Sequence, residues 1–235
     1  MKSMRVDFRK IQRMMRPSQR DLIMVCVGIV IALIVFGLGI LRQHMQTPLP
    51  AESDQITTAW IPDTVKKWHT QIEQQAKRYN IDPNLAAIIM TMESGGYARA
   101  DSGYAQGLMQ ITPATAKEIA SRHLKTPVKS FNIWDPSTNI ELGAAYLAWL
   151  RDEFGTSRQG PSWNSTVELI AAGYNGGPGA ANSLEQGKGL HDTQTVVYSR
   201  DAFNMWRERV SKDSPTFDRW KERGGQALLD KAATQ

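Results

Sequence analysis

Glu93 is the residue of this sequence best placed to act as an acid. It stands in the last turn of a predicted apolar helix, IDPNLAAIIMTMESGG, directly before Ser94 and two glycines. A carboxyl group there faces the negative end of the helix dipole and apolar neighbours, and both favour its protonated form. A general acid needs such an environment to hold its proton near neutral pH. The alternative is a surface glutamate at a helix end, and position alone does not separate the two.

Three short sequence words around this glutamate favour the functional interpretation. They occur in order along the chain as Glu93-Ser94-Gly95-Gly96, Gly107-Leu108-Met109-Gln110-Ile111 and Ala171-Ala172-Gly173-Tyr174-Asn175-Gly176-Gly177-Pro178-Gly179. Together they resemble the catalytic domain of the soluble-type lytic transglycosylases, which are related to goose-type lysozymes. The resemblance covers roughly residues 70–210. It implies a mainly α, lysozyme-like helical domain with a glycan-binding groove.

The same resemblance implies roles for individual residues. Glu93 matches the sole catalytic acid/base, and Tyr174 matches an active-site tyrosine expected to bond near it. Tyr198 would end a looser element of acid, Thr, two variable residues and Tyr, in which Gln194 stands where an acid is usual. Core packing is an equal alternative for Met109, because methionine often fills gaps in cores. The residues expected to bind the glycan are Ser102, Met109, Gln110, Tyr174, Asn175 and Tyr198.

A single carboxyl group suffices for the reaction that this resemblance implies. Most glycosidases need two carboxylates. In a lytic transglycosylase the C6 hydroxyl of N-acetylmuramic acid attacks C1 of the same sugar, which gives a 1,6-anhydro end without water or a cofactor. A muramidase that uses water is the nearest alternative, and Asp101 is its candidate second carboxylate. A non-catalytic, membrane-tethered wall-binding scaffold is the alternative from another class.

Helices should position these residues, because apolar side chains recur at intervals of three and four from about residue 63 onward. Asp82-Pro83, Thr112-Pro113 and Asp135-Pro136 are start signals, with a capping side chain before a proline in the first turn. No stretch alternates well enough to predict a sheet, although a small hairpin at 96–107 is compatible with the pattern. The helices expected lie at about 63–79, 83–94, 113–123, 136–154, 166–172 and 197–210.

An apolar segment near the N-terminus predicts a membrane anchor. Leu22 to Leu41 is twenty residues without a charge, and such a helix spans about 30 Å, the hydrocarbon thickness of a bilayer. Basic residues dominate the N-terminal side, so this end should stay in the cytoplasm. The run is too long for a cleaved signal peptide, and Cys26 lacks the small preceding residue of a lipoprotein site. The expected divisions are 1–21 cytoplasmic, 22–41 anchor, 42–62 stalk, 63–210 catalytic domain and 211–235 tail.

The charge balance and the cysteine count exclude several classes of function. The formal net charge is +5, but residues 1–42 hold eight Lys/Arg against two Asp/Glu, and the remainder holds twenty against twenty-one. The basic character therefore belongs to the anchor's flank, and nothing indicates a nucleic-acid partner. One cysteine and four scattered histidines give no metal-binding pattern.

The predicted partners are therefore the glycan strands of peptidoglycan and, through residues 22–41, the bacterial inner membrane. A small anchored wall-cutting enzyme would suit local opening of the wall for an envelope-spanning secretion or conjugation machine. Ordinary wall turnover fits equally well, and the sequence does not choose between them.

Overall fold

A computed structural model describes residues 54–124, 130–154 and 166–235 of the chain. This part is mainly helical, as predicted, and it contains no β-strand. The two isolated bridges, Asp101 with Gln106 and Gln106 with Ile111, lie at the region where a hairpin was considered. The predicted anchor at 22–41 lies outside the described residues. Among the helices that are described, none is both long enough and apolar enough to cross a membrane.

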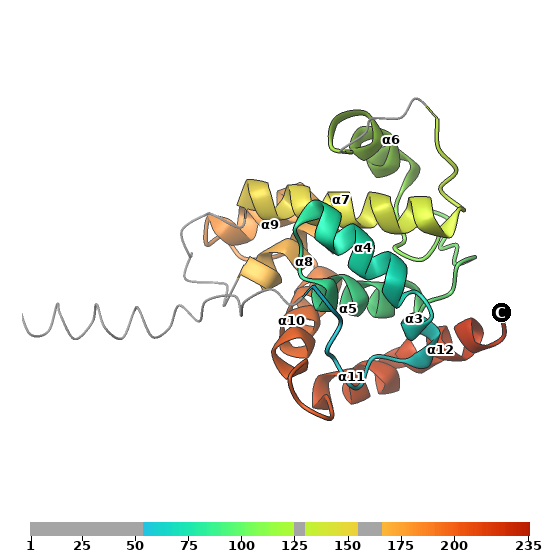
Figure 1. Ribbon diagram of the computed structural model, residues 1–235. Helices are drawn as coiled ribbons and strands as arrows, with labels where there is room; N and C mark the ends of the chain where they lie inside the picture. Colours follow the sequence, from blue (N-terminus) through green and yellow to red (C-terminus); the bar gives the residue numbers. More distant parts are fainter. Residues whose placement is uncertain (1–53, 125–129, 155–165) are drawn as a thin grey trace, which may run out of the picture. The chain divides into compact units, whose positions relative to one another are not determined.

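Helix α5 (Pro83–Ser94) runs through the middle of the domain (Figure 1). It packs against α4 (His69–Tyr79) and α7 (Pro136–Phe154), which lie above it in the view, and against α10 (Thr193–Glu208) below. Helix α8 (Thr166–Gly176) packs in turn on α7 and α10. The segments that carry the three sequence words therefore meet around one core.

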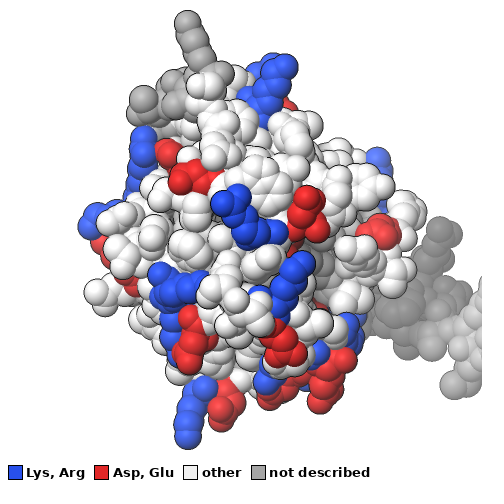
Figure 2. Space-filling view, turned by 90° about the vertical axis from the view of Figure 1, so that its right-hand side faces the viewer, with Lys and Arg blue, Asp and Glu red and all other residues white. Residues whose placement is uncertain are grey.

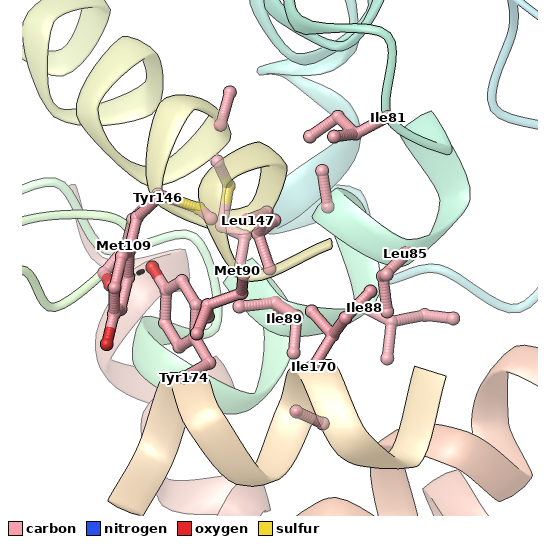
Figure 3. Packing of buried hydrophobic residues seen from close by; sticks show 14 of the residues in the cluster. Ile81, Leu85, Ile88, Ile89, Met90, Met109, Tyr146, Leu147, Ile170 and Tyr174 are labelled. Carbon is pink, nitrogen blue, oxygen red and sulfur yellow. Dashed lines mark hydrogen bonds between the residues drawn. The ribbon is translucent and has the colours of Figure 1, made fainter. Parts of the chain in front are cut away.

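Apolar side chains from three helices form that core. Ile88, Ile89 and Met90 of α5 face Leu147 of α7 and Ile170 of α8 (Figure 3). All five are at most 5% exposed. Burial of such side chains contributes about 1.5–3 kcal/mol each relative to full exposure. The core thus fixes α5 at its centre, and with it the position of Glu93.

Local signals set the helix boundaries as expected. Asp82 caps α5 by accepting a hydrogen bond from the amide of Asn84, and Pro83 fills the first turn. Thr112 caps α6 (Pro113–Arg122) in the same way. Gly95 ends α5 in the left-handed conformation, at φ 62°. A residue with a β-carbon adopts this conformation only at a cost, so glycine suits the position.

Several elements differ from the sequence prediction. The first predicted helix is divided at Trp68 into α3 (Asp63–Lys66) and α4. Helix α9 (Pro178–Glu185) was not predicted, and α10 begins at Thr193, four residues before the expected start. Asp192 explains that start, because its carboxylate caps the helix by accepting from the amide of Thr195.

The segments at both ends of the predicted catalytic domain are packed against it. Thr58 and Ile61 are buried, and Asn84 accepts hydrogen bonds from the amide and hydroxyl of Thr58 at 3.1 and 2.8 Å. The folded unit therefore includes residues 54–62, ahead of the expected boundary at 63. Beyond residue 210, where the sequence predicted a tail, the chain forms packed helical segments: α11 (Pro215–Trp220), the π-helical η1 (Lys221–Gly225) and α12 (Gln226–Ala233).

Charged side chains on the surface are mixed in sign. Figure 2 shows Lys and Arg interspersed with Asp and Glu on the face that it presents, with broad uncharged areas between them. Among the described residues, pairs such as Lys77 with Asp54 at 2.9 Å bring opposite charges together. Exposed pairs of this kind contribute at most about 1 kcal/mol each. The charge pattern on this face therefore has little bearing on the fold.

Candidate active site

Glu93 is the one residue of α5 that reaches the surface. The other eleven residues of this twelve-residue helix are buried, and Glu93 alone keeps partial exposure. The apolar sequence of the helix explains the difference, since it packs on neighbouring elements on every side. Its last turn therefore presents a single carboxyl group at the edge of the core.

The hydroxyl group of Tyr198 is the direct partner of that carboxyl group. Tyr198 lies on α10 and donates a hydrogen bond to Oε1 of Glu93 at 2.6 Å. Burial raises the pKa of Glu93 from 4.5 to about 7, and the hydrogen bond from Tyr198 opposes part of that shift because it stabilises the charged form. At neutral pH the carboxyl group is therefore divided between its protonated and ionised forms. A general acid that must also act as a base needs this property.

Tyr174 lies close by but bonds elsewhere. Its hydroxyl group donates to the main-chain carbonyl of Met109 at 2.8 Å (Figure 3). Burial raises the pKa of Tyr174 well above its ordinary value, and the negative charge of Glu93 raises it further. The tyrosine expected beside the glutamate is thus within its electrostatic influence, while Tyr198 makes the direct contact. The ring of Tyr146 packs against Tyr174 with 5.2 Å between ring centroids.

The word Gly107–Ile111 is held mainly through its main chain. The amide of Met109 donates to Oδ1 of Asn139 at 2.7 Å. The side chain of Met109 is 1% exposed and fills the space over Gly143, where an added β-carbon would come within 2.7 Å of it. Packing thus accounts for the burial of the Met109 side chain. The contact between Met109 and Tyr174 is made through the main-chain carbonyl oxygen of Met109. The sequence left open whether Met109 packs in the core or lines the groove, and its side chain lies in the core.

Gln110 and Ser102 hold the loop between the first two words. Gln110 adopts a left-handed conformation at φ 45°, and its side-chain amide donates to the carbonyls of Ala100 and Gly107 at 3.0 and 3.1 Å. Ser102 is exposed, and its hydroxyl accepts from the amide of Ala105 at 3.1 Å. Both side chains therefore shape the loop, and Ser102 is accessible from solvent.

Asn175 lies beside a hollow of about 450 Å³ next to the start of α10. Its side-chain oxygen accepts from the hydroxyl of the buried Thr195 at 3.0 Å. Thr195 precedes Tyr198 by one helical turn, so this bond ties the third sequence word to the helix that carries Tyr198. Glu93 does not line the hollow. The lining residues are Asn175, Gly176, Gly179, Ala180, Ser183, Gly189, Leu190, His191, Asp192, Gln194 and Thr195.

Ser94 also positions the site, although no role was predicted for it from the sequence. Its buried hydroxyl donates to the carbonyl of Leu108 at 2.7 Å and accepts from the amide of Gly96 at 3.1 Å. It thereby joins the end of α5 to the second sequence word. Its place inside the word Glu93-Ser94-Gly95-Gly96 was the available signal, since a serine between an acid and a tight turn commonly bonds nearby main chain.

These features define a helical domain with one enclosed, partly protonated carboxyl group between three sequence words. The sequence profile of the Transglycosylase SLT domain family matches residues 70–197, which contain all three words, and Tyr198 directly follows the matched region. The chain belongs to this family.

Relatives of this chain carry names from the same family. It is 35% identical over 117 residues to the "Transglycosylase" of Enterobacteria phage PRD1, which covers 49% of this chain and 37% of that protein. It is 37% identical over 98 residues to the "Membrane-bound lytic murein transglycosylase E" of Buchnera aphidicola, covering 40% of this chain and 44% of that one. The chain thus spans less than half the length of these relatives.

A solved structure also matches. It is that of an inactive mutant of the lytic transglycosylase Slt from Pseudomonas aeruginosa, with 25% identity and a TM-score of 0.47, and the match covers 63% of this chain and 25% of the other.

Proposed function

We propose that this protein is a peptidoglycan lytic transglycosylase in which Glu93 is the sole acid/base. It would cleave the β-1,4 bond between N-acetylmuramic acid and N-acetylglucosamine. The observation that carries the proposal is the enclosed carboxyl group of Glu93, with a pKa of about 7 and a tyrosine hydroxyl at 2.6 Å. The names of the relatives point to the same reaction.

The reaction needs one group that first gives and then takes a proton. Protonated Glu93 would donate to the bridging oxygen, and the bond from that oxygen to C1 of the muramoyl sugar would break. The C6 oxygen would then attack C1, and its proton would pass to the carboxylate of Glu93. The products are a 1,6-anhydromuramoyl end and a free glucosaminyl hydroxyl, and no water is consumed. Intramolecular attack of this kind can have an effective molarity on the order of 10⁵ M or more.

Tyr198 would stabilise the carboxylate that this proton transfer creates. Its hydroxyl already donates to Glu93, and a hydrogen bond to an ionised group is about twice as strong as one between neutral groups. Tyr174 would act on the other wall of the site by holding the carbonyl of Met109 in place. The two tyrosines thus have different tasks in this proposal.

The surroundings of Glu93 favour a single carboxylate over a hydrolytic pair. A water-using glycosidase places its two carboxyl groups about 5–9.5 Å apart, so a second negative charge would raise the pKa of the first. Burial raises the pKa of Glu93 and Tyr198 lowers it, and no acidic neighbour among the described residues contributes. Asp101, the candidate second carboxylate, is exposed and accepts from the amide of Gly103 at 2.8 Å.

We assign the remaining predicted residues to the glycan. Ser102 is exposed on its loop and would contact the muramoyl sugar, while Gln110 and the main chain of Met109 would shape the adjoining wall. The hollow beside Asn175 would extend the binding groove past the cleavage point. Its mixed lining of glycines and polar side chains suits a sugar strand, which offers both hydroxyl groups and flat apolar faces.

The proposed location is the inner membrane, with residues 22–41 as a single span, the N-terminus in the cytoplasm and the catalytic domain outside. Support comes from the twenty uncharged residues and their basic flank. Local opening of the wall for a secretion or conjugation machine and general wall turnover are both compatible with this placement. Crosslinking followed by a pull-down from membranes distinguishes them, because only the first yields components of such a machine.

Digestion of purified sacculi by the full chain in detergent tests the reaction. Mass spectrometry should find anhydromuramoyl ends, which are lighter than reducing ends by one water. Reducing ends would instead identify a muramidase, and release of no fragments would favour a wall-binding scaffold.

Asp101→Asn separates the two catalytic alternatives. The proposal expects a rate close to wild type, because Asp101 has no part in the proton transfers. A loss comparable with that of Glu93→Gln would favour the water-using mechanism.

A further inference from the structure

The turn that follows Glu93 lies between the two ends of the folded domain. A β-carbon added to Gly96 would come within 2.2 Å of the carbonyl oxygen of Thr64, in α3. One added to Gly95 would lie 3.0 Å from the main chain of Leu228, in α12. Helices α3 and α12 also contact one another. Both lie outside residues 70–197, so segments beyond the matched family region enclose this turn.

The side chain of Gln235 bonds this turn at two points. Its Nε2 donates to the carbonyl of Gly96 at 2.8 Å, and its Oε1 accepts from the amide of Ala98 at 3.0 Å. The carbonyl of Gly96 also accepts from the indole N–H of Trp68 at 3.0 Å. One primary amide thus fixes both a carbonyl and an amide of residues 96–98, as a neighbouring strand would. Lys231 adds a contact, with its ammonium group 5.0 Å from the ring centre of Tyr97.

Residues 96–98 form the base of the loop that carries Ser102. The amide of Ala100 donates to the carbonyl of Tyr97 at 3.2 Å, and the amide of Gly107 donates to the carbonyl of Ala100 at 2.8 Å. Gln110 donates to the same carbonyl of Ala100. A chain of hydrogen bonds therefore runs from Gln235 through the base of the loop to the second sequence word.

We propose that Gln235 is a positioning residue that holds this loop in its glycan-binding conformation. The inference rests on the proposed function, because it takes the loop around Ser102 as a wall of the glycan groove. Glu93 itself is held separately, by α5 and by Tyr198 of α10. Loss of the Gln235 contacts should therefore weaken glycan binding and leave the acid in place.

If Gln235 only stabilised the fold, its removal would lower the thermal midpoint of unfolding, and the packing of α12 argues against this. The buried residues that dock α12 are Leu229 and Ala232, at 9% and 1% exposure. Gln235 lies two residues beyond the end of this helix and is exposed. Removing its amide therefore leaves the packing of α12 intact, and the thermal midpoint should hardly move.

Binding of soluble, uncrosslinked glycan strands tests the proposal in a chain that cannot cut them. The comparison is between Glu93→Gln and the double variant Glu93→Gln with Gln235→Ala. Two hydrogen bonds are lost, so the Kd should rise roughly three- to tenfold. Gln226→Ala is the matched control, since this glutamine lies on α12 and bonds Asp230 at 2.8 Å. It should leave the Kd unchanged.

Hydrogen exchange gives a readout that depends on neither catalysis nor glycan. Peptides covering residues 96–100 should exchange faster in Gln235→Ala than in wild type or Gln226→Ala, because the amide of Ala98 loses its acceptor. Faster exchange together with a weaker Kd and an unchanged thermal midpoint supports the proposal. An unchanged Kd overturns it, and so does an equal rise in Gln226→Ala. If sacculi yield no anhydro ends while the Kd still rises, the proposed reaction fails and the positioning role stands.

Discussion

Two largely buried carboxyl groups, one on α5 and one on α10, have opposite surroundings. Glu93 meets the hydroxyl of Tyr198, and Asp201, one turn further along α10, is paired with the guanidinium of Arg223. Burial raises the pKa of both groups. At Asp201 the positive charge of Arg223 opposes the shift. At Glu93 only the neutral hydroxyl group of Tyr198 opposes the shift, and the pKa reaches about 7.

The comparison separates a structural carboxylate from a reactive one. A buried charge is costly unless a partner compensates it. Arg223 supplies that partner for Asp201, which then joins α10 to the C-terminal segment. Among the described residues, no cation lowers the pKa of Glu93. Its carboxyl group can therefore hold a proton at neutral pH and donate it to the leaving oxygen.

Glu93→Gln should have the largest effect on catalysis. Glutamine keeps the size of the side chain but can neither donate nor accept the proton, so kcat should fall by about 10³-fold or more. The release of anhydro ends from sacculi measures it. Asp201→Asn, the matched neutralisation of the compensated carboxylate, should keep its activity. Equal losses of activity in the two variants would contradict the distinction between a reactive carboxylate at Glu93 and a structural one at Asp201.

Tyr198→Phe should have the next largest effect. Loss of a hydrogen bond to a charged group costs about 1.5–3 kcal/mol, so kcat should fall roughly ten- to a hundredfold. The Tyr198 bond lowers the pKa of Glu93, so its removal should move that pKa upward. The alkaline limb of the pH profile of kcat should then shift to higher pH. Tyr104→Phe, at a side chain that is 85% exposed, is the control and should not shift it.

Glu93→Gln should also stabilise the fold at alkaline pH. The folded-state pKa of about 7 lies above the ordinary 4.5, so Glu93 favours folding below pH 4.5 and that contribution is lost as the pH rises to about 7. The neutral glutamine does not undergo this loss, so the variant should gain about 3 kcal/mol of stability at pH 8 relative to pH 4. Urea unfolding at pH 8 and pH 4 measures it. An equal difference at both values would contradict the assigned pKa.

Asp201→Asn should have the smallest effect. The charge of Arg223 offsets part of the cost of burying Asp201, and the arginine side chain is 46% exposed and can turn to water. Stability should therefore change by about 1 kcal/mol or less, and kcat by less than about twofold. The same unfolding and digestion assays measure both. A large loss of activity would show that this ion pair supports the position of Tyr198.

The sequence predicted the elements that have strong local signals. Asp82-Pro83 and Gly95 mark the ends of α5, so the helix and the position of Glu93 in its last turn followed directly. Helix α9 was missed because Pro178 and Gly179 belong to a glycine-rich run that is typical of a loop. The segment after residue 210 has weak periodicity, yet Phe217 and Leu229 are buried in contacts that only the folded domain supplies.

The arrangement of the site depends on contacts far apart in the chain. Tyr198 and Glu93 are 105 positions apart, and Gly96 and Gln235 are 139 apart. No local pattern encodes such contacts. The resemblance to the family supplied the tyrosines as candidates, but which of them bonds Glu93 became clear only from the packing of α10 against α5 and of α8 against α10.

A direct titration of Glu93 tests the central claim. Carbon-13 NMR of the side-chain carboxyl groups of the full chain in detergent follows each resonance with pH, and Glu93→Gln identifies the signal. The uncompensated carboxyl group should titrate with a pKa of about 7. A value near the ordinary 4.5 would contradict the account, because Glu93 would then be ionised at neutral pH and unable to serve as the acid.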